Sequence, residues 1–178
     1  MSTRILVVAA VLFALVATVG AENPNQAFNG RIIVSSKRFP QSAKSPSAYT
    51  AAIRKLSQTN FYEDKTDHTW VIWCAGFLKA PLPDVEYTVK IYELTGKTQQ
   101  FLSAVDQFAD SSGQRTITTK LKLEKKQFGV NKALMFTIES KGKMLASSGM
   151  IKILGEGDRF SGKVEFSEDE ANGKDKDE

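Results

Sequence analysis

Residues 68–77 read HTWVIWCAGF and contain the only histidine and the only cysteine of the 178-residue chain. Successive side chains of a β-strand point to opposite faces, and beyond the first residues of this stretch both sets are apolar. A strand with two apolar faces is covered on both of them. We therefore expect this stretch to be the central strand of the fold, with a facing sheet on one side and a helix on the other.

Cys74 is expected to have a structural role in that strand. Burial raises the pKa of a thiol and blocks access to it, which predicts an unreactive core residue. A Cys74–His68 catalytic dyad is excluded within one strand, because six residues span about 20 Å and a dyad needs an approach of about 3 Å. With a single cysteine no internal disulfide can form. Trp73 is expected in the core, and His68 near solvent.

The surrounding sequence predicts an all-β fold. The segments VEYTVKIYE (85–93) and RTITTKLKLE (115–124) alternate apolar and polar residues, as strands buried on one face do. Further strands are expected at 31–39, 98–108, 133–140 and 144–154, with short turn signals between them. About seven antiparallel strands at these intervals favour a β-sandwich that is immunoglobulin-like or fibronectin-like at the level of the fold.

One short helix is expected among the strands, at about residues 46–58. Ser45 can cap its first turn, and Pro46 suits its first position. Its apolar residues, which share one helical face, are Tyr49, Ala52, Ile53 and Leu56. This amphipathic pattern predicts an inserted helix that packs on the sheet.

The two ends of the chain predict export and an acidic tail. Residues 1–21 combine a cation at Arg4, an apolar run and a small residue at Ala21, which is typical of a cleaved secretory signal peptide. The run is shorter than the roughly 20 residues of a membrane span, so we expect a mature chain without a transmembrane segment, in the periplasm or the extracellular space. A flexible lead-in (22–29) would precede a single domain (30–166) and a disordered tail (167–178).

Charge is distributed unevenly along the chain. Residues 22–154 carry 19 Lys and Arg against 11 Asp and Glu, whereas residues 155–178 carry 4 against 9. A basic body with an acidic tail can attract a polyanion, or its tail can cover the body. The alternative is a solvated surface followed by a disordered tail.

Catalytic and metal chemistry find little support. One histidine and one cysteine cannot supply the four ligands of a structural zinc site, and the G-x-S-x-G motif of serine hydrolases is absent. We therefore expect no catalytic residue, no metal and no cofactor. A hydrolase with a pair of carboxylates from different strands stays open, because spacing along a sequence cannot show such a pair.

Two surfaces are candidates for binding. A cationic face is predicted from lysines on two strands and just beyond one of them, namely Lys90, Lys120, Lys122, Lys125 and Lys126. An aromatic patch is predicted from Phe61, Tyr62, Trp70 and Tyr92. The sequence thus predicts an exported, non-catalytic protein that binds a partner or forms part of the cell envelope. The main alternative is a module that binds anionic polysaccharide or lipid headgroups, and nucleic acid is not expected because the protein is exported.

Overall fold

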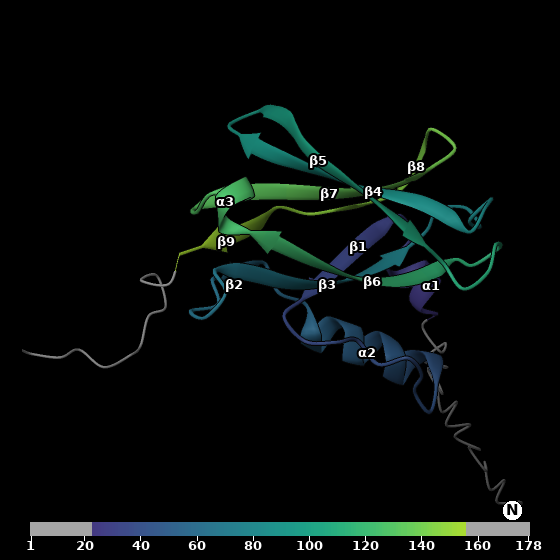
Figure 1. Cartoon of the computed structure of the whole chain (residues 1–178). Coiled ribbons are helices and arrows are strands. Elements are labelled where there is room, and N and C mark those ends of the chain that lie inside the picture. Colours follow the sequence, from purple (N-terminus) through teal and green to yellow (C-terminus); the bar gives the residue numbers. More distant parts are fainter. Residues whose placement is uncertain (1–22, 156–178) are drawn as a thin grey trace, which may run out of the picture.

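The computed structural model describes residues 23–155, and Figure 1 shows their arrangement. The predicted signal peptide, the end of the predicted domain (156–166) and the predicted acidic tail lie outside the described residues. No helix within residues 23–155 is long and apolar enough to cross a membrane.

The described chain is mostly β, which confirms the predicted all-β class. The strands are β1 (Arg31–Ser35), β2 (Asn60–Tyr62), β3 (Thr69–Phe77), β4 (Glu86–Thr95), β5 (Thr98–Phe108), β6 (Thr116–Glu124), β7 (Lys132–Ser140), β8 (Lys143–Ser148) and β9 (Ile151–Leu154). The helices are α1 (Pro24–Ala27), α2 (Pro46–Leu56) and α3 (Lys125–Phe128).

All nine strands belong to one open mixed sheet. β5 pairs with β4 and β4 with β7, whose other edge pairs with β9 through Lys132–Leu134 and with β8 through Thr137–Ser140. From β8 the sheet continues through β1 and β3 to β6. In Figure 1 the strands β5, β4 and β7 lie above β1, β3 and β6, with α2 below.

This topology corrects the predicted seven antiparallel strands. The segment 144–154, expected as one strand, is broken at Gly149 and Met150 into β8 and β9. β1 pairs with β8 in parallel, and so does the short β2 with β9. The sheet is therefore mixed, and an immunoglobulin-like arrangement is not confirmed.

Two hydrophobic clusters flank β3. The first core lies between the β5–β4–β7 layer and the β1–β3–β6 layer, and β3 contributes Trp70, Ile72 and Cys74 to it. The second core lies between the sheet and the helices α1 and α2, and β3 contributes Ala75 and Phe77 to it. Both faces of β3 are therefore covered, as the sequence predicts. Burial raises the pKa of the Cys74 thiol strongly, in keeping with its expected structural role.

Helix α2 confirms the predicted helix and its cap. The Ser45 hydroxyl accepts a hydrogen bond from the Ala48 amide at 3.2 Å, and Pro46 begins the helix. Ile53 is fully buried against the sheet. The predicted flexible lead-in is wrong for residues 23–29, because Asn23 caps α1 and Phe28 is buried in the second core against Phe77.

The two layers approach closely at Gly76 of β3. A Cβ atom built there would lie 2.4 Å from Ile138 Cδ1 of β7 and 3.3 Å from Ile117 Cγ1 of β6. Gly76 therefore lets the side chain of Ile138 fill the space against β3.

Candidate functional site

The structure does not bring the five predicted lysines onto one face. Lys90 lies on β4, where Val89 and Ile91 face the first core, so Lys90 points outward from the β5–β4–β7 layer. Lys120 and Lys122 alternate with buried residues of β6 and point outward from the opposite layer. The predicted cationic face is therefore divided between two sides of the molecule.

Most of these lysines are also neutralised. The Lys90 ammonium lies 2.6 Å from Glu139, a hydrogen bond that raises the Lys90 pKa. Lys122 donates to Asp67 at 2.6 Å, a contact that raises the pKa of Lys122 and lowers that of Asp67. Lys126 lies exposed on α3 and makes no ion pair within residues 23–155.

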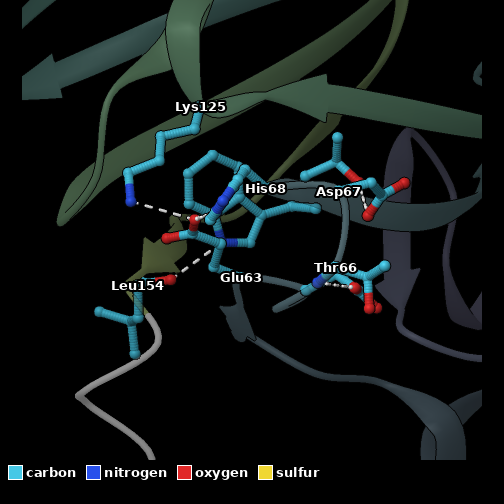
Figure 2. Close-up of polar contacts among 9 residues, drawn as sticks. Glu63, Thr66, Asp67, His68, Lys125 and Leu154 are labelled. Carbon is cyan, nitrogen blue, oxygen red and sulfur yellow. Dashed lines mark hydrogen bonds and ion pairs between the residues drawn. The ribbon is translucent and has the colours of Figure 1, made fainter.

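Lys125 belongs to a cluster around a buried carboxylate (Figure 2). Glu63 is 1% exposed and accepts hydrogen bonds from His68 Nδ1 at 2.6 Å and from Lys125 Nζ at 3.0 Å. The His68 hydrogen bond, followed by that from Lys125, lowers the Glu63 pKa. The backbone amide of Glu63 donates a hydrogen bond to the Leu154 carbonyl at the end of β9. This cluster therefore fastens the loop between β2 and β3 to two other parts of the fold, α3 and β9.

The same loop holds His68 in an uncommon conformation. His68 has a φ of +52°, in the left-handed region, and its amide donates to the Asp64 carbonyl at 3.1 Å. The His68 side chain is 61% exposed, as predicted, and Glu63 fixes its ring orientation. Catalysis by this pair would need a nucleophile or a metal beside the ring. Cys74 is buried elsewhere, and no cluster of His, Cys, Asp and Glu suited to a metal ion is found in residues 23–155.

The predicted aromatic patch is wrong for two of its four members. Phe61 and Trp70 are buried in the first core, and Trp70 Nε1 donates to the Leu154 carbonyl at 2.9 Å. Tyr62 is 37% exposed, and Tyr92 packs edge-on against Phe101 with ring centroids 5.8 Å apart. Alternation places Trp70 and Trp73 on opposite faces of β3, and Trp73 is the one that reaches the surface.

Trp73 forms a cationic platform with Arg38 and Lys120. Lys120 is its direct cross-strand neighbour on β6, and the Lys120 Nζ lies 5.7 Å from the centroid of the indole ring. Arg38 Cζ lies at the same distance from the ring. Both distances are within the range of cation–π attraction, about 6 Å.

Local structure positions Arg38 at this ring. The Ser35 hydroxyl, at the end of β1, accepts a hydrogen bond from the Lys37 amide at 3.0 Å and turns the chain. The Gln58 side chain accepts another from the Ser36 amide at 2.8 Å. Phe39 then anchors the segment in the second core. Sequence alternation could not show this contact, because Arg38 lies beyond the strand.

The platform carries two positive charges without a carboxylate partner. Neither Arg38 nor Lys120 makes an ion pair within the described part of the chain, whereas Lys122, two residues further along β6, is held by Asp67. Residues 23–155 carry 19 Lys and Arg against 10 Asp and Glu, so this part of the chain is positive overall. Within residues 23–155, an anion at Trp73 would therefore meet two cations that no carboxylate already holds.

An open cleft of about 890 Å³ begins beside the platform. Thr118 pairs with Ala75 one step along the strands from the Trp73–Lys120 pair, and Thr118 and Thr116 line the cleft. Tyr49 of α2 packs against the second core, as Trp73 does, and also lines the cleft. The platform and the cleft are thus neighbours on one surface, because successive outward side chains of β6 lie about 7 Å apart.

A second cleft, of about 400 Å³, bears on the carboxylate alternative. It is lined by Asp84, Glu86 and Glu139. Lys90 holds Glu139 at 2.6 Å and Lys141 holds Asp84 at 3.4 Å, so two of the three carboxylates are already paired with a lysine. The arrangement does not favour an acid–base pair for sugar hydrolysis.

Comparison with known proteins adds no further assignment, because no protein-family model and no curated protein matches this chain.

Proposed function

We propose that this is an exported, non-catalytic binding protein that holds an anionic ligand on the Arg38–Trp73–Lys120 platform. The observation that carries the proposal is the convergence, on one partly exposed indole ring, of two cations that make no ion pair within residues 23–155. Export rests on the sequence of residues 1–21. The ligand is expected in the periplasm or the extracellular space.

The chemistry of the platform suits a planar or ring-shaped anion. A guanidinium group can donate two parallel hydrogen bonds to a carboxylate or sulfate group, and an ammonium group adds a point charge. The indole ring of Trp73 holds these two cations next to each other. This geometry replaces the broader lysine face expected from the sequence.

The test compares two lysines on the same face of one strand. Lys120→Gln removes a cation of the platform, whereas Lys122→Gln removes one that Asp67 already holds. A charge-assisted hydrogen bond contributes about 1.5–3 kcal/mol, so Lys120→Gln should weaken binding to heparin roughly tenfold to a hundredfold. Lys122→Gln should have a much smaller effect. Lys97→Gln, in the turn between β4 and β5, controls for net charge.

Affinity would be measured by calorimetry at low salt, with elution from immobilised heparin as a second measurement. Arg38→Gln should resemble Lys120→Gln. Equal losses for Lys120→Gln, Lys122→Gln and Lys97→Gln would show that only net charge matters and would refute the platform. If the wild type were not retained on immobilised heparin at all, a structural role in the envelope would be the better hypothesis.

A further inference from the structure

The cleft beside the platform differs from the platform in its chemistry. Its lining offers hydrogen-bonding side chains from Gln41, Gln114, Thr116 and Thr118, with aromatic rings from Tyr49 and Phe108. Lys44 adds a cation, and the carboxylate in the lining is Asp110. Amide and hydroxyl groups can both donate and accept hydrogen bonds, which suits a ligand rich in hydroxyl groups.

The dimensions of the cleft fit a ligand larger than one ring. About 890 Å³ lies in the upper part of the range of small-molecule pockets, roughly 300–1,000 Å³. Phe108 is 73% exposed at the end of β5 and lines the cleft, as does Tyr49 of α2. An exposed aromatic ring at the edge of a polar cleft can cover the apolar face of a sugar ring.

We infer that the ligand is an acidic oligosaccharide, with one acid-bearing sugar on the Arg38–Trp73–Lys120 platform and the following sugars in the cleft. This inference rests on the proposed function, since the platform supplies the charge recognition. The register of β3 and β6 supplies the continuity, because Lys120 and Thr118 are consecutive outward residues of β6. A polyphosphate or a lipid phosphate would use the platform and gain little from the hydrogen-bonding cleft.

The test measures how affinity depends on ligand length. We expect a hexasaccharide of galacturonic acid to bind the wild type at least about tenfold more tightly than the disaccharide, because only the longer ligand reaches the cleft. Phe108→Ala and Gln114→Ala should each remove most of this gain and leave disaccharide binding unchanged. Phe101→Ala is the matched control, since Phe101 is also exposed on β5 but does not line the cleft.

Further ligands separate the sources of charge and distinguish the two proposals. A heparin-derived hexasaccharide tests sulfate against carboxylate, polyphosphate tests charge without sugar, and maltohexaose tests sugar without charge. This inference would be overturned if both cleft variants still bound the hexasaccharide more tightly than the disaccharide by the wild-type factor. It would also be overturned if polyphosphate bound as tightly as the hexasaccharides. Neither result would contradict the platform. If Lys120→Gln and Arg38→Gln had no effect while Phe108→Ala weakened hexasaccharide binding, the proposed function would fall and a sugar-binding cleft would remain.

Discussion

The close approach of the two layers at Gly76 gives a prediction that tests the packing of the fold. Gly76 has no side chain, and a methyl group there would lie 2.4 Å from Ile138 Cδ1. Gly76→Ala therefore forces Ile138 to move. Ile138→Val removes the Cδ1 atom itself and opens the space that the new methyl group needs. The two substitutions should consequently compensate each other.

The magnitudes follow from the contacts. Overpacking of a core costs about 1–3 kcal/mol, and Gly76→Ala alone should lower the free energy of unfolding by about that amount. Alanine also restricts the unfolded chain more than glycine does, which offsets up to about 1 kcal/mol of this cost. Ile138→Val alone should cost about 0.5–1.5 kcal/mol. In the Ile138→Val background, Gly76→Ala should be close to neutral. The remaining contact with Ile117 Cγ1, at 3.3 Å, needs only a small shift.

Urea unfolding of the four proteins, followed by tryptophan fluorescence, gives the coupling energy. We expect a coupling of about 1–2 kcal/mol, well above the 0.3–0.5 kcal/mol within which independent sites add. If Gly76→Ala had the same cost in both backgrounds, the proposed contact between β3 and β7 would be wrong. Gly96→Ala, in an open turn with no atom near its Cβ position, shows the cost of a strained φ alone and should not couple to Ile138.

Two further predictions concern the loop cluster and the thiol. The Glu63 pKa is lowered in the folded protein, so its stabilising contribution is present above its pKa in the unfolded chain and is lost as the pH falls through the folded value. The unfolding free energy should accordingly decline less steeply between about pH 5 and pH 3 for Glu63→Gln than for the wild type. Glu124→Gln, which changes an exposed carboxylate, is the control and should follow the wild type. Parallel profiles for all three proteins would contradict the stabilising contacts of Glu63. Cys74 should react with a thiol reagent only in urea, and rapid labelling of the native protein would show that β3 is not buried as described.

The features that could be predicted from the sequence are those encoded in neighbouring residues. The alternation in residues 69–77 and 116–124 specifies which side chains are buried, and Ser45 with Pro46 specifies where α2 begins. Strand neighbours could not be predicted, because the parallel pairing of β1 with β8 joins segments more than 100 residues apart. The break at Gly149 was also missed, since the apolar residues Leu145 and Ala146 before it and Met150 and Ile151 after it suggest one continuous strand.

The candidate site shows the same limit. The outward row of Lys120 and Lys122 on β6 is recognisable, but the ion pair that neutralises Lys122 joins it to Asp67, 55 residues away, and the one that neutralises Lys125 of α3 joins it to Glu63, 62 residues away. The exposure of Trp73 depends on where the helices lie, because Ala75 and Phe77 are completely buried in the second core and Trp73 is buried only in part. Arg38 joins the site through a turn that no periodic pattern marks.

The position of β3 between two cores has a consequence for how the protein unfolds. Detaching α1 and α2 would expose Phe77 and Ile53 to water, and separating the two layers would expose Trp70 and Ile72 on the same strand as Phe77. Neither core can open without weakening the strand that the other one needs. The helix and the sheet should therefore behave as one cooperative unit, in which the amides of α2 and β3 exchange their hydrogens at similarly slow rates.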